Sequence, residues 1–152
     1  MKKKGIILSL AACILIIGGC IGWRILTDYS RVLNANWGIS LPYKALYSEV
    51  YEKDSGASFH GDGIRYHVFS YKYEDYIDLM FAWSSNNNHK TLFHNSYSET
   101  AEEWLDELNV PDEWRPDYEK CYYWYKAQED NSQLIIFWDN DANQLYIAEE
   151  FI

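Results

Sequence analysis

Hydrophobic and polar positions after residue 43 recur with two different periods, and they predict both strands and helices. Residues 64–69 alternate with a period of two, which is the pattern of a β-strand. Residues 133–138 are apolar after the first position, which predicts a central strand. Turn residues separate three C-terminal segments, which therefore form a predicted three-stranded antiparallel β-meander. The strands predicted besides residues 64–69 are 43–53, 120–127, 133–138 and 144–151.

Two segments have the three-to-four residue spacing of an amphipathic helix. The first is 74–83. The second is predicted to begin at Thr100, with Glu103 three positions later as a capping box, and to be stopped by Pro111. Its predicted buried face consists of Ala101, Trp104, Leu105 and Leu108. Strands, then two helices, then strands predict an α+β domain with an antiparallel sheet.

The N-terminal segment is predicted to be a membrane anchor or a signal. Residues 5–23 carry no charge and follow three lysines, and as a helix they would be about 28 Å long, close to the thickness of a bilayer core. The lysines orient the N-terminus towards the cytoplasm and the rest of the chain outwards. We expect a membrane segment over 1–25, a connector over 26–42 and an extracytoplasmic α+β domain over 43–152.

Three fates of the N-terminal segment remain open. It can stay as a single-pass anchor, or it can be cleaved as a simple secretion signal. It can also be the signal of a lipoprotein, because the small residues before Cys20 resemble a lipobox, in which that cysteine is lipidated. Cys13 is a second candidate, but the apolar stretch that precedes it is short. All three place the domain outside the cytoplasm, and the anchor and the lipoprotein hold it on the outer face of the cell membrane.

The charge of the chain is strongly asymmetric. Residues 25–152 contain nine Lys and Arg against 23 Asp and Glu, a formal net charge of −14. Such a field repels nucleic acid, which we exclude as a partner, and anionic lipid headgroups. It suits a cationic protein or cell-wall partner, or it serves solubility alone. The many Tyr and Trp side chains fit either a core or a contact surface.

Cys121 is the only cysteine after residue 25, so the domain has no internal disulfide framework. It lies in an aromatic strand pattern, which favours a small core residue over a nucleophile.

The sharpest local pattern is Asp139-x-Asp141-x-Asn143, which matches the first three ligand positions of an EF-hand calcium loop. Two features oppose a metal site: the sixth position is Gln144 instead of glycine, and the flanks are strands. A hairpin turn rich in Asp and Asn explains the same residues, and we favour it.

The second candidate is His60-Gly61-Asp62-Gly63, where a base and a carboxylate lie on a glycine loop that a ligand could approach. The alternative, which we favour, is structural, because Asp-Gly between extended segments is a strong hairpin signal. No catalytic motif is present, so the sequence predicts no catalytic residue and no cofactor.

Three short motifs resemble a group of proteins. They are a Gly-x-x-Leu-Pro stretch over 38–42, an Phe-x-Gly-Asp-Gly turn over 59–63 and an Asn-x-Leu-Tyr strand over 143–146. Together with the lysine-led apolar segment, they resemble small uncharacterised membrane-anchored envelope proteins of Gram-positive Firmicutes. The resemblance implies an extracytoplasmic location and a single domain, and it implies no catalytic residues.

These features favour a non-enzymatic, membrane-tethered extracytoplasmic binding module. A special case is a membrane-held immunity protein that neutralises a basic toxin. The alternatives are a small envelope hydrolase or metal-dependent enzyme that uses His60 and Asp62, and a calcium-stabilised domain.

Overall fold

The computed structural model describes residues 29–42, 46–56, 62–73, 77, 80–81 and 97–152. The chain divides into two compact units, Met1–Leu41 and Pro42–Ile152. Residues 1–28, with the expected membrane segment and Cys20, lie outside the described residues. Within the described residues, no helix has the length and apolar character needed to cross a membrane.

The described part of the first unit is a short helix, α2, which spans Tyr29–Trp37. Its buried side chains recur every four residues and therefore share one face: Tyr29, Leu33 and Trp37. Gly38 ends the helix with a φ of +72°, and its N–H donates to the carbonyl of Asn34 at 2.8 Å. The predicted connector over 26–42 therefore contains a helix that the sequence analysis did not predict.

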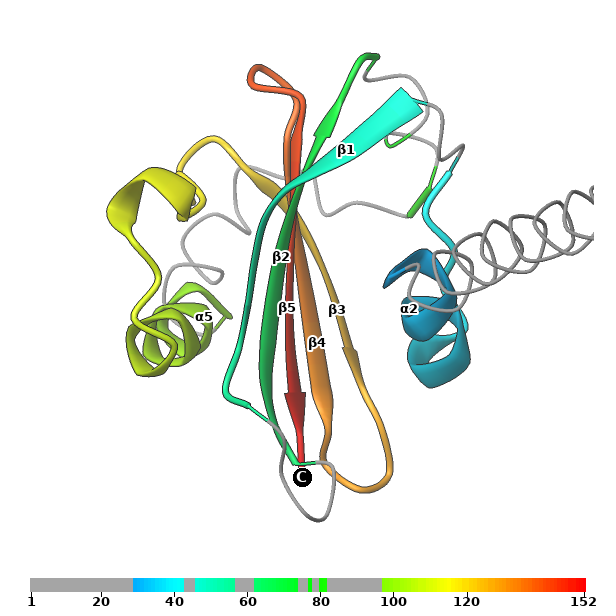
Figure 1. Cartoon of the computed structure of the whole chain (residues 1–152), viewed down its shortest axis with the longest axis vertical. Coiled ribbons are helices and arrows are strands. Elements are labelled where there is room, and N and C mark those ends of the chain that lie inside the picture. Colours follow the sequence, from blue (N-terminus) through cyan, green and yellow to red (C-terminus); the bar gives the residue numbers. More distant parts are fainter. Residues whose placement is uncertain (1–28, 43–45, 57–61, 74–76, 78–79, 82–96) are drawn as a thin grey trace, which may run out of the picture. The chain divides into compact units, whose positions relative to one another are not determined.

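The second unit contains one five-stranded sheet, in which every pair of neighbouring strands is antiparallel. The strands are β1 (Tyr47–Asp54), β2 (Gly63–Tyr71), β3 (Tyr122–Ala127), β4 (Gln133–Asp139) and β5 (Gln144–Phe151). The order across the sheet is β1-β2-β5-β4-β3 (Figure 1). The predicted α+β class, the antiparallel sheet and the C-terminal meander are confirmed.

The C-terminal strand occupies the middle of the sheet. β5 pairs with β2 on one side and with β4 on the other. β4 lies between β5 and β3, as its apolar run predicts, and Leu134, Ile136 and Trp138 are fully buried on one face while Ile135 and Phe137 are fully buried on the other. Both faces of the sheet centre are therefore covered, and β1 and β3 are left as edges.

Helix α5 (Tyr97–Glu107) packs against one face of the sheet (Figure 1). The predicted buried face of this helix is confirmed. The shared core contains, from the helix and its end, Ala101, Trp104, Leu105, Leu108 and Val110, and from the strands, Ile64, Tyr66, Val68, Ile135, Phe137, Tyr146 and Ala148. This apolar burial is the main force that fixes the helix on the sheet.

The start of α5 differs from the prediction. The helix begins at Tyr97, so Thr100 lies inside it and is not the N-cap. Glu99 falls in the first turn, where its charge suits the positive end of the helix dipole. The Ser-x-x-Glu spacing that marks a capping box also occurs four residues earlier in the sequence, at Ser96 and Glu99, and competes with the pattern at Thr100.

The end of α5 is set by Asn109 and not by Pro111. Asn109 has a φ of +54°, and its N–H donates to the carbonyl of Asp106 at 3.0 Å. The N–H of Val110 donates to the carbonyl of Leu105 at 2.9 Å. These two bonds form a Schellman motif, which terminates the helix before the proline. A short 3₁₀ turn, η2, follows over Asp112–Trp114.

The other predicted helix, 74–83, lies mostly outside the described residues. Of its stripe, Ile77 is helical and fully buried. The N–H of Met80 donates to the carbonyl of Ile77 at 2.9 Å, and the ring of Phe81 stacks on Trp124 of β3 at 4.5 Å.

Candidate functional site

The candidate loop at residues 60–63 is described only in its second half. His60 and Gly61 lie outside the described residues, and Asp62 is exposed. Gly63 is the first residue of β2 and pairs with Phe151, so it is a strand residue and not the turn residue that the sequence suggested. The structure therefore brings no partner to Asp62 within the described residues that would support a base and carboxylate pair.

The candidate calcium loop is a hairpin turn between β4 and β5. One carboxylate oxygen of Asp139, Oδ1, accepts the N–H groups of Asp141 at 3.0 Å and Ala142 at 2.9 Å. Asn143 has a φ of +53°, a left-handed conformation that Asn tolerates well. Asp141 is exposed. These contacts are those of an Asx turn, which supports the structural interpretation of the pattern.

Cys121 is buried next to the sheet core. Burial, followed by the negative charges of Asp139 and Asp117, raises the pKa of its thiol well above the usual range. A thiol held in its protonated form is a poor nucleophile, so these surroundings support a core role.

A polar group that the sequence did not single out lies on the sheet face opposite α5. It joins Glu49 and Glu52 of β1 to His67 of β2, and the ligand atoms of the three side chains all lie within 4.8 Å of one another. Nδ1 of His67 and Oε1 of Glu49 are 2.6 Å apart. The His67 side chain is 12 % exposed and that of Glu49 is 34 % exposed, so the group lies at the surface with the imidazole partly covered.

A β-bulge in β1 explains why these three side chains converge. Glu52 pairs with His67, while Glu49 pairs with Phe69, and the register shifts between Glu49 and Tyr51. In a regular strand, residues three apart point to opposite faces. The extra residue in the bulge reverses that parity, so both glutamates share the face of His67 and Phe69. No sequence pattern marks this bulge, which is why the group could not be predicted.

The ring of Phe69 lies beside the imidazole on the same face of β2. The two rings are nearly parallel, with an interplanar angle of 13° and centroids 6.2 Å apart. Phe69 itself is buried and packs edge-on against Tyr47 at 5.4 Å. Beside the group lies a hollow of about 310 Å³, which is lined by Glu52, Lys53, Asp54 and His67.

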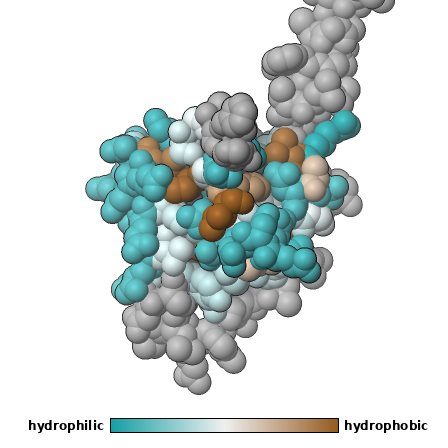
Figure 2. All heavy atoms as spheres, turned by 90° about the horizontal axis from the view of Figure 1, so that it is seen from below, coloured by the Kyte–Doolittle hydropathy of each residue, from teal (hydrophilic) through white to brown (hydrophobic). Residues whose placement is uncertain are grey.

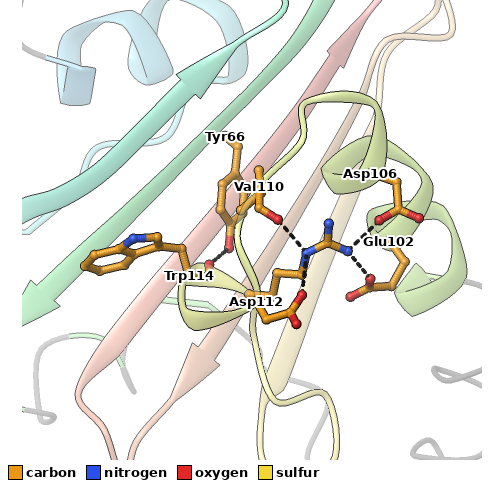
Figure 3. Close-up of polar contacts among 7 residues, drawn as sticks. Tyr66, Glu102, Asp106, Val110, Asp112 and Trp114 are labelled. Carbon is orange, nitrogen blue, oxygen red and sulfur yellow. Dashed lines mark hydrogen bonds and ion pairs between the residues drawn. The ribbon is translucent and has the colours of Figure 1, made fainter.

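A second polar group ties α5 to the loop that follows it (Figure 3). Nη1 of Arg115 contacts Glu102 at 2.6 Å and Asp106 at 2.7 Å, and its Nε donates to the carbonyl of Val110 at 2.9 Å. The hydroxyl of Tyr66 donates to the carbonyl of Trp114 at 2.7 Å. The polar groups of Arg115 and Tyr66 all bind the backbone or helix α5, so these contacts stabilise the fold.

No protein family, no curated protein and no solved structure matches this chain.

Proposed function

We propose that this chain is a non-enzymatic binding module of the bacterial cell envelope, tethered by its N-terminal segment, whose domain binds a cationic protein on the outer face of the cell membrane. The tether and the orientation are supported by the three lysines ahead of the uncharged residues 5–23. The nature of the partner is supported by the charge that α5 and the following loop carry.

The acidic surface of α5 is the observation that carries the proposal. Residues 99–120 contain nine Asp and Glu and two basic residues, Arg115 and Lys120. Arg115 is already held between Glu102 and Asp106, and Lys120 pairs with Asp117 at 2.6 Å. The carboxylates that are exposed in this stretch, which we call the acidic surface, belong to Glu99, Glu103, Asp106, Glu107, Asp112, Glu113, Asp117 and Glu119.

The acidic surface lies on rigid elements. The opposite side of α5 is fixed in the core by Ala101, Trp104 and Leu105, and Arg115 anchors the loop. Hydrophilic residues cover much of the described surface on the face drawn in Figure 2. A concentrated charge of one sign on a fixed scaffold attracts an oppositely charged protein and speeds its encounter. An immunity protein for a basic toxin is a special case of this binding mode.

The enzymatic alternative stays a prediction. It depends on His60, which lies outside the described residues, and Asp62 alone does not define a reaction.

A matched pair of charge reversals tests the proposal. Glu107 on α5 and Glu129 in the turn between β3 and β4 are both exposed. We expect Glu107→Lys to reduce capture of the partner from solubilised envelope proteins of the producing cell about tenfold at low salt, because it places like charges together. Glu129→Lys changes the net charge equally and should capture the partner as the wild type does. A lysine in the last turn of α5 suits the helix dipole, so the fold should persist.

Two readouts decide the outcome: the amount of the captured protein, by quantitative mass spectrometry, and its isoelectric point. A basic protein that is lost with Glu107→Lys and kept with Glu129→Lys supports the proposal. Equal capture by both variants, or an acidic protein, contradicts it.

A further inference from the structure

We propose that Glu49, Glu52 and His67 form a binding site for a divalent transition-metal ion, with Zn²⁺ as the reference ion. The site lies on the sheet face opposite α5, so it is separate from the acidic surface and does not depend on the proposed partner.

The spacing of the three side chains fits one ion. Tetrahedral ligands bound to Zn²⁺ at about 2 Å lie about 3.3 Å from one another. Nδ1 of His67 and Oε1 of Glu49 are 2.6 Å apart, and all three ligand atoms fall within 4.8 Å. Small side-chain rotations therefore bring one imidazole nitrogen and two carboxylate oxygens onto a single ion.

The charge of the group favours a cation. Two carboxylates three positions apart on one strand are held close together by the bulge between them, and like charges at this distance repel. In the part of the chain that the structure describes, Glu52 forms no ion pair with a lysine or an arginine. Lys53 lines the adjoining hollow, but the three ligands themselves carry a net negative charge when the imidazole is neutral.

The scaffold is prepared for binding. The three residues lie on paired strands, and the contact of 2.6 Å between Nδ1 of His67 and Oε1 of Glu49 already orients the imidazole. Ligands that are already oriented lose little entropy when the ion binds. The hollow of about 310 Å³ that Glu52 and His67 help to line gives room for water to complete the coordination.

The ligand types select the ion. Imidazole nitrogen suits Zn²⁺ and other late first-row ions, whereas Ca²⁺ and Mg²⁺ prefer oxygen ligands alone. We therefore expect the full chain, purified in detergent, to bind one Zn²⁺ saturably and to bind Ca²⁺ and Mg²⁺ much more weakly. Isothermal titration calorimetry with the three chloride salts measures this directly.

Two ligand variants and one control locate the ion. His67→Gln and Glu52→Gln should each weaken Zn²⁺ binding at least about tenfold, since loss of even an outer partner of a metal ligand costs that much. His89→Gln, which removes a histidine from outside the described residues, should bind like the wild type. Zn²⁺ should also raise the unfolding temperature of the wild type by mass action, and Glu52→Gln should lose this shift.

Glu52 is exposed, so Glu52→Gln keeps the fold and decides the question even if His67→Gln is unstable. Zn²⁺ affinities of Glu52→Gln and a folded His67→Gln within twofold of the wild type would overturn the site. Absence of saturable binding by the wild type at millimolar Zn²⁺ would overturn it as well.

Discussion

Gly63→Ala should lower the free energy of unfolding by about 2 kcal/mol or more. Gly63 has a φ of +134°, which a residue with a Cβ rarely adopts. A Cβ there would also overlap Oγ of Ser55. That oxygen accepts the N–H of Ile64 at 3.0 Å at the end of the β1–β2 pair where the chain passes from β1 to β2, so it cannot move away without losing the bond.

Gly56→Ala is the matched control for this prediction. Gly56 also has a positive φ, +93°, but a Cβ at this position has no heavy atom within 4 Å. Gly56→Ala should lower the free energy of unfolding by only about 1 kcal/mol, the cost of placing alanine at a positive φ. Urea unfolding followed by tryptophan fluorescence measures both variants. If the two substitutions lower the free energy of unfolding equally, the contact with Ser55 does not contribute to the effect.

Tyr66→Phe should lower the free energy of unfolding by about 1–3 kcal/mol, whereas Tyr71→Phe should leave it unchanged or raise it slightly. Both tyrosines lie on β2 and both are buried. The hydroxyl of Tyr66 donates to the carbonyl of Trp114 at 2.7 Å, and so ties β2 to the 3₁₀ turn η2. The hydroxyl of Tyr71 has no hydrogen-bond partner among the described residues. Its removal therefore avoids the free-energy cost of burying an unpaired polar group in the folded state.

The same urea titration compares these two variants, which each lose one oxygen atom from one strand. Equal losses would mean that the bond to Trp114 contributes nothing beyond packing. A large loss for Tyr71→Phe would mean that its hydroxyl is satisfied in solution.

The elements that the sequence predicts well are those whose burial is decided within a few residues. The apolar run 133–138 is short and bounded by turn residues, which predicts a strand covered on both faces, and the stripe of Ala101, Trp104 and Leu105 predicts a helix face in a core. Short or marginal patterns are harder. Helix α2 shows only three buried positions in nine residues, and two Ser/Thr-x-x-Glu patterns compete for the start of α5.

The candidate sites are hard to predict for a different reason. The patterns at 60–63 and 139–143 are local, and local Asp, Asn and Gly residues serve turns as readily as ligands. The group of Glu49, Glu52 and His67 is assembled by strand pairing and by one bulge. Neither the register of β1 against β2 nor the extra residue leaves a periodic mark in the sequence, so the convergence emerges only in three dimensions.

Site-specific photo-crosslinking in the intact producing cell tests whether the acidic surface binds a basic envelope protein. A photoreactive residue in place of Glu113 lies on the acidic surface, and one in place of Glu129 lies in the exposed turn between β3 and β4. We expect the full chain to crosslink a single basic envelope protein from position 113 and not from position 129. No adduct from position 113, or the same adducts from both positions, would contradict this expectation.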